Sequence, residues 1–118
     1  MTKTLSMILW TAPYGCQNTS TALRLAKAAT QKGYSVRLFA SGDGVHNFTK
    51  DQKASGIPNA EKEFTELMQA GLKVELCGTC LNFRGIKNED ISDGAERSTM
   101  KNLFTMVKES DVCITLWS

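Results

Sequence analysis

The sequence lacks an excess of charge of either sign. Its 14 Lys and Arg residues are nearly balanced by 12 Asp and Glu residues, so the formal net charge is only +2. The lysines are also scattered along the chain rather than clustered. Because nucleic acids and membrane surfaces are recognised through basic patches, neither is expected as a direct partner.

Long hydrophobic stretches are missing too. The apolar run over residues 5–12 is much shorter than the about 20 residues that a helix needs to cross a bilayer. It has no basic leader and no small-residue cleavage site, so it does not match a secretion signal. We therefore expect a cytoplasmic protein, in which the four cysteines act as reactive thiols or metal ligands rather than structural disulfides.

No repeat, low-complexity tract or flexible linker divides the chain. We therefore expect one domain over residues 1–118, a length that can bury a core without covalent staples. The P-loop, the GxGxxG fingerprint and the GxSxG elbow are all absent from the sequence. No nucleotide and no other cofactor is expected.

Short apolar segments alternate with segments of helical periodicity. This alternation predicts an α/β fold, a three-layer α/β/α sandwich with a parallel sheet of four to five strands. Residues 86–97 hold either the fifth strand or a loop. The predicted strands are 4–10, 35–40, 72–77 and 111–117, and the predicted helices are 18–33, 58–71, 78–85 and 98–109.

Two details concern the end of the chain. The last predicted helix carries Met100, Leu103, Phe104 and Val107 on one apolar face. Cys113 lies in the middle of the last predicted strand, among apolar neighbours, so we expect it to pack in the core.

Three polar loops follow predicted strands. They comprise residues 13–18, 41–47 and 77–84. In an open parallel sheet, ligands collect beyond the carboxyl ends of the strands. The three loops are therefore expected to meet at one edge and to form the functional site.

The most distinctive of these loops contains Cys77-Gly78-Thr79-Cys80. Cys77 ends a strand and Cys80 falls in the following turn, where helix N-terminal amides favour a thiolate. Gly78 leaves room for the approach of another sulfur or a partner chain, and Arg84 adds positive charge. Such a thiolate is a nucleophile at neutral pH.

Other interpretations of this pair remain. Both cysteines can be small buried residues of a tight turn. A CxxC beside a βα turn also occurs in thioredoxin-like dithiol switches, although their motif comes earlier in the chain order. Zinc needs four ligands, and Cys16, Cys77, Cys80 and His46 have no metal-site spacing, so no metal site is predicted.

The other two loops supply further candidates. Cys16 is either a second sulfur acceptor or resolving thiol, or an incidental loop residue. It follows Tyr14-Gly15, in a loop that precedes a helix and can hold an anion there.

The loop after the second strand contains Gly42-Asp43-Gly44, whose glycines permit left-handed backbone conformations. Asp43 caps local amides, polarises a neighbour, or only forms the turn. His46, with an unperturbed pKa near neutral, is either a proton shuttle for a thiol or a solvated loop residue.

Residues 13–15, 39–45 and 77–86 carry a family resemblance. In them the chain resembles the DsrE/DsrF-like proteins of sulfur metabolism, which include the TusD-type subunits of sulfur relay. The third segment is the most specific, because a cysteine followed eight residues later by the Gly of Arg-Gly-Ile recurs in that family.

The resemblance implies a three-layer fold, assembly into a homo-oligomer (trimer or hexamer), and other small sulfur-transfer proteins as partners. It implies that Cys77 accepts sulfane sulfur as a persulfide and passes it on, as a sulfur carrier or sulfurtransferase. Trp10 and Trp117, near strand ends, are candidates for burial against a neighbouring subunit. Two alternatives stay open: a ligand-binding or assembly module with passive cysteines, and a CxxC dithiol oxidoreductase.

Overall fold

Five parallel strands form one sheet in the computed structural model, which describes residues 2–117. Their order across the sheet is β4-β3-β2-β1-β5. All four neighbouring pairs are parallel. The strands are β1 (Thr4–Leu9), β2 (Ser35–Ala40), β3 (Lys73–Cys77), β4 (Ala95–Ser98) and β5 (Val112–Leu116).

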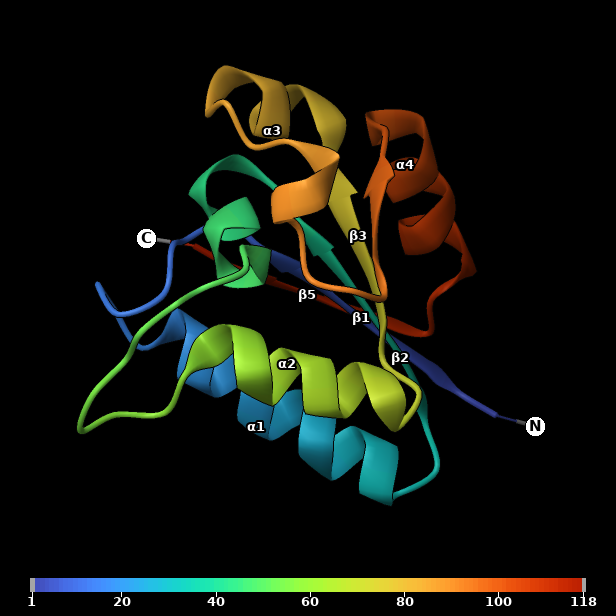
Figure 1. The fold of residues 1–118 in the computed structure, drawn as a ribbon. Helices are drawn as coiled ribbons and strands as arrows, with labels where there is room; N and C mark the ends of the chain where they lie inside the picture. The colour runs from blue at the N-terminus through green and yellow to red at the C-terminus, as the bar shows by residue number, and fades with distance from the viewer. Residues whose placement is uncertain (1, 118) are drawn as a thin grey trace.

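Helices cover both faces of this sheet (Figure 1). α1 and α2 lie together on one face, and α4 lies on the other. The predicted three-layer α/β architecture is thus confirmed. The helices are α1 (Asn18–Gln31), α2 (Ala60–Gln69), α3 (Gly78–Phe83) and α4 (Met100–Glu109), with the short 3-10 helices η1 (Gly42–Phe48) and η2 (Asn88–Asp90).

The hydrophobic core has two parts, because successive side chains of a strand point to opposite faces. Leu38 and Leu76 point towards α1 and α2, into the larger part. Phe39 and Cys77, the next residues along, point towards α4 and pack with other buried side chains there. Cys77, the last residue of β3, therefore lies in the smaller core, because the side chains of a strand point alternately to its two faces.

The carboxyl ends of the strands are level. Leu9 pairs with Ala40 on one side and with Leu116 on the other, and Ala40 pairs with Leu76. The loops after β1, β2 and β3 consequently begin at the same height, which is the arrangement expected for the site.

The segment left open by the sequence contains a strand. β4 is short and polar, and it pairs only with β3, at the edge of the sheet. An edge strand exposes much of its surface, so it shows no apolar run by which the sequence could reveal it.

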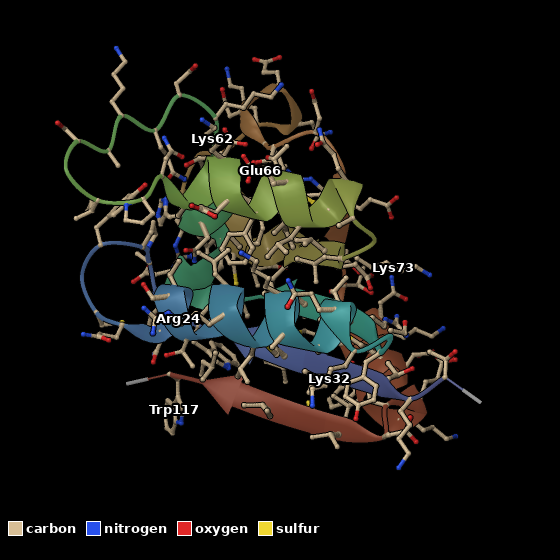
Figure 2. The ribbon with its side chains drawn as sticks, turned by 90° about the horizontal axis from the view of Figure 1, so that it is seen from below. Arg24, Lys32, Lys62, Glu66, Lys73 and Trp117 are labelled. Atoms are coloured by element: carbon tan, nitrogen blue, oxygen red, sulfur yellow. The ribbon has the colours of Figure 1, made fainter. Side chains whose placement is uncertain are left out.

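The expectation that Cys113 packs in the core is wrong. Cys113 pairs with Ser6 and is exposed, since β5 is the other edge strand and the small core under α4 is built from β1, β2 and β3. Figure 2 shows β5 at this edge, with Trp117 beside the end of the strand. Trp117 is 73% exposed.

The apolar face of α4 is divided. Leu103 and Met106 are buried against the sheet, whereas Phe104 is 71% exposed. Met100 and Val107 are exposed as well. One half of this face therefore stabilises the fold, and the other half is uncovered in the single chain.

No helix within residues 2–117 combines the length and apolar character needed to cross a bilayer.

Gly44 provides a test of how closely η1 packs on β1. A Cβ atom at this position would lie 2.0 Å from the carbonyl oxygen of Leu9. Gly44→Ala must push the backbone of η1 away from the sheet, so we expect the free energy of unfolding to fall by about 3 kcal/mol. Urea denaturation measures this change.

Gly15→Ala is the matched control, because nothing lies within 4 Å of its added methyl group. It should change the free energy of unfolding by less than about 0.5 kcal/mol. Equal stabilities of the two variants would contradict the packing described for η1.

Candidate functional site

η1 and α3 lie side by side at the carboxyl edge of the sheet (Figure 1). η1 follows β2 and α3 follows β3. Gly42 and Asp43 in η1 contact Cys80 and Arg84 in and after α3. The structure thus joins two of the three loops that were expected to meet.

Cys80 is the more exposed thiol of the pair, and its surroundings are more polar than those of Cys77. Its Sγ accepts a hydrogen bond from the backbone N–H of Gly42 at 3.2 Å, and the hydroxyl of Ser41 lies 3.7 Å from the same sulfur. Its side chain is half-buried. These donors can hold a negative charge on the sulfur.

The surroundings lower the pKa of Cys80. Partial burial is the largest single influence and acts to raise it. Hydrogen bonds from the Cys77 thiol, the Gly42 N–H and the Ser41 hydroxyl, together with the charge of Arg84, outweigh that burial and bring the pKa below its usual value. Cys80 therefore carries more thiolate than an ordinary cysteine at neutral pH.

Cys77 is in the opposite situation. It is only 5% exposed and packs with Phe39, Leu103 and Met106 beneath α4. Burial raises its pKa, as do its hydrogen bond to Cys80 and the charge of that neighbour, although the N–H groups of Cys80 and Thr79 oppose the shift. Cys77 stays a protonated thiol where Cys80 ionises.

Arg84 and Asp43 connect the two elements. Nε and Nη2 of Arg84 donate to Oδ1 of Asp43 at 2.9 and 2.7 Å, and Nη1 donates to the carbonyl oxygen of Cys80 at 3.1 Å. The hydrogen bonds and charge of Arg84 hold the pKa of Asp43 below its usual value. This pair sets η1 against α3 and brings a cation near Cys80.

Gly42 is required where its N–H meets the sulfur. Its φ is +56°, a left-handed conformation, and a Cβ would lie 3.3 Å from Cε3 of Trp10. A larger residue would be strained at this position. The glycine thus allows the amide to face Cys80 while the loop packs on Trp10.

Two other glycines of the predicted pocket, Gly44 and Gly78, serve packing. Gly44 lies against the backbone of Leu9 and Trp10, so it does not line open space. The room expected beside Gly78 is filled, because a Cβ there would meet the Ser98 carbonyl oxygen at 3.2 Å and the Arg97 side chain at 3.3 Å. The expectation that Gly78 leaves room for another sulfur or a partner chain is therefore corrected.

The third loop packs elsewhere. The hydroxyl of Tyr14 donates to Gln52 at 2.6 Å and accepts from the N–H of Ala60 at 3.1 Å, which ties the loop to the start of α2. Tyr14 has φ +75°, while Gly15 has free space around it. Tyr14 is therefore an anchor for this loop and makes no hydrogen bond to the thiols within the described residues.

Cys16 is exposed on that loop. The nearby Thr11 hydroxyl and Asn18 N–H lower its pKa. Within residues 2–117 no hydrogen bond links Cys16 to Cys77 or Cys80. It is a separate reactive thiol in this structure.

His46 lies in η1, and its backbone carbonyl accepts hydrogen bonds from Thr49 and Gln52. Its imidazole makes no hydrogen bond to a thiol in the described part of the chain. The described residues also contain no cluster of three or more His, Cys, Asp or Glu side chains suited to a metal ion.

Sequence reasoning missed Ser41, which is 1% exposed and places its hydroxyl beside Cys80. Its position directly after the second strand is the signal that could have identified it, because such positions line the carboxyl edge. Thr79 is exposed in the first turn of α3 and contributes its backbone N–H to Cys77.

Residues 3–116 match the DsrE/DsrF-like family. The chain belongs to that family. The uncharacterized protein MJ0989 of Methanocaldococcus jannaschii is 37% identical over 110 residues, covering 93% of this chain and 96% of that one. The protein YchN of Escherichia coli is 31% identical over 106 residues, covering 88% of this chain and 91% of its own.

The crystal structure of YchN superposes with a TM-score of 0.88 at 29% identity and covers 98% of this chain and 100% of YchN. A protein of Methanobacterium thermoautotrophicum, MTH1491, has a TM-score of 0.74 at 18% identity, covers 98% of this chain and 100% of its own, and shares the fold. The DsrE/DsrF-like family is associated with sulfur relay, and these relatives carry no name that specifies a sulfur-transfer reaction.

Removing the charge of Arg84 should raise the pKa of Cys80. We expect Arg84→Gln to slow the labelling of Cys80 by iodoacetamide several-fold near neutral pH, because less of the sulfur is thiolate. The pH dependence of labelling, followed cysteine by cysteine by peptide mass mapping, gives the shift. Cys16 serves as an internal control, since its pKa depends on Thr11 and Asn18.

Arg24→Gln is the matched control variant. Arg24 lies on α1, on the opposite side of the molecule from α3 (Figure 1), and its loss removes one positive charge without touching Cys80. The role of Arg84 would be refuted if both variants labelled Cys80 at the same rate as the unaltered chain.

Proposed function

We propose that this protein handles sulfur through Cys77 and Cys80, accepting sulfane sulfur as a persulfide and passing it to a partner protein. The observation that carries the proposal is the hydrogen bond from the Gly42 N–H to Cys80 Sγ, at the edge of the sheet where ligands collect. The family association with sulfur relay supports the same reaction class.

The chemistry follows from the thiolate. A thiolate attacks the outer sulfur of a donor persulfide, and the donor thiol departs. The resulting protein persulfide is an anion near neutral pH, so it needs hydrogen-bond donors and positive charge around it. The Gly42 N–H, the Ser41 hydroxyl and Arg84 are the groups that can supply them.

A dithiol oxidoreductase is the second candidate. It is favoured by the proximity of the two cysteines, because Cys80 packs against the buried cluster that contains Cys77. Such an enzyme reduces disulfide substrates, which a sulfur carrier does not need to do. Turnover of a small disulfide in the presence of a reductant distinguishes the two.

We propose further that the protein forms a homo-oligomer, a trimer or hexamer, through side chains that a single chain leaves uncovered. On α4 these are Met100, Phe104 and Val107, and Trp117 follows β5. Large apolar side chains exposed on one helix face favour contact with another protein surface. The partners that receive or deliver sulfur are expected to be other small sulfur-transfer proteins.

Sulfur loading tests the main proposal. After incubation with a persulfide donor and removal of excess reagent, we expect sulfur to be found on, or released from, the Cys77/Cys80 pair. A retained sulfur adds about 32 Da to the chain in mass spectrometry. The Cys77→Ser/Cys80→Ser double variant should carry no sulfur on the peptide with residues 77 and 80, and peptide mapping separates that peptide from any sulfur bound to Cys16.

The Cys113→Ser variant is the control for this experiment, because Cys113 is exposed on the edge strand, outside the carboxyl edge. It should handle sulfur as the unaltered chain does. If the double variant took up sulfur as fast as this control, the pair would not be the acceptor.

A charged substitution on α4 tests whether the protein forms the proposed oligomer. Phe104→Asp should shift the mass measured by light scattering after size-exclusion chromatography from the oligomer to the single chain, because a buried carboxylate is costly at an interface. Ile57→Asp, a change at another exposed apolar residue in the loop before α2, should leave the oligomer intact. A monomeric unaltered chain would refute the assembly.

A further inference from the structure

The two thiols of the pair differ in access. Cys80 is half-buried beside η1, whereas Cys77 is 5% exposed and enclosed by apolar side chains under α4. A donor persulfide that approaches from solvent therefore meets Cys80 first. Cys77 lies behind it, in the buried cluster against which Cys80 packs.

We propose that Cys80 is the thiolate that takes sulfur from the donor, and that Cys77 is the resolving thiol that displaces this sulfur as hydrosulfide. This assignment rests on the uptake of sulfane sulfur in the proposed function, replaces the transfer to a partner protein by release as hydrosulfide, and reverses the order that the family resemblance implies. It makes the protein a persulfide reductase at its Cys77/Cys80 pair, with hydrosulfide as the form in which the sulfur leaves.

The first step transfers sulfur without net oxidation. Cys80–S⁻ attacks the outer sulfur of R–S–SH, the donor S–S bond breaks and a new S–S bond forms to Cys80. The donor's S–H proton passes to the departing sulfur, which gives R–SH and Cys80–S–S⁻. The Gly42 N–H and the Ser41 hydroxyl stabilise the attacking sulfur before this step.

The second step uses the buried thiol. Cys77–SH attacks Cys80 Sγ, its proton passes to the terminal sulfur, and HS⁻ departs. The products are a Cys77–S–S–Cys80 disulfide and hydrosulfide: two thiols are oxidised, and the transferred sulfur is reduced by two electrons. A dithiol reductant then restores the pair, so this class of reductant must act after each turnover.

The environment of Cys77 suits this role. Burial and the neighbouring charge of Cys80 keep it protonated while Cys80 is a free thiolate, so the two thiols do not compete for the donor. When the sulfur is bound, the negative charge moves one atom outward from Cys80 Sγ. The negative charge that keeps Cys77 protonated is then further from it, and Cys77 already lies beside the residue that it must attack.

Single-turnover chemistry tests the assignment. Reduced protein is mixed with glutathione persulfide without reductant, and hydrosulfide, intact mass and modified peptides are measured. The unaltered chain should release one hydrosulfide per chain and lose about 2 Da as its disulfide forms. Cys77→Ser should retain about 32 Da on Cys80 and release no hydrosulfide, whereas Cys80→Ser should do neither.

Three results would overturn the proposal. Loading of Cys77 in the Cys80→Ser variant at the rate of the unaltered chain would reverse the order. A stable persulfide on the unaltered chain, with no hydrosulfide, would exclude Cys77 as the resolving thiol. Sulfur uptake by none of the chains would instead refute the proposed function as a whole.

Folding of the variants needs its own control. Cys113→Ser should match the unaltered chain in both circular dichroism and hydrosulfide release, since this cysteine is exposed on β5. A measurement on the unaltered chain avoids variants altogether: iodoacetamide should label Cys80 at least about tenfold faster than Cys77 at pH 7. Faster labelling of Cys77 would contradict the assignment.

Discussion

The hydrogen bond from the Gly42 N–H to Cys80 Sγ joins two loops that follow different strands, and the candidate chemistry depends on it. A backbone amide can reach a sulfur in this way only if η1 approaches closely. Gly44 permits that approach by packing on Leu9, and the Arg84–Asp43 pair maintains it on the outer side. The packing of the fold therefore holds a backbone hydrogen-bond donor beside the Cys80 thiol, and no mobile side chain is needed for this.

The difference between the two cysteines has the same origin in the sheet. Cys77 is the last residue of β3, so its side chain follows the alternation of the strand and points into the core under α4. Cys80 is one turn further on and faces η1. Two identical side chains, three positions apart, thus acquire pKa values displaced in opposite directions.

Much of the fold could be predicted from the sequence. Apolar runs at 35–40 and 72–77 indicated buried parallel strands, and both are present as β2 and β3. β4 was left open as either a strand or a loop, because an edge strand needs no apolar pattern. Cys113 was placed wrongly because apolar neighbours in a strand do not tell whether a helix covers that strand. Sheet order decides such questions, and it involves residues far apart in the chain.

By itself, the sequence determined the layered α/β fold and the position of Cys77 and Cys80 at the carboxyl edge, because hydrophobic periodicity and local spacing suffice for these. Its motifs also carried the resemblance to the family. Tertiary structure alone decided which thiol is accessible, that Ser41 and Gly42 attend Cys80, and that Cys16 stands apart. The physical reason is distance along the chain. Burial, hydrogen bonding and charge at a sulfur are set by groups from other strands and helices, about which the residues next to a cysteine carry little information.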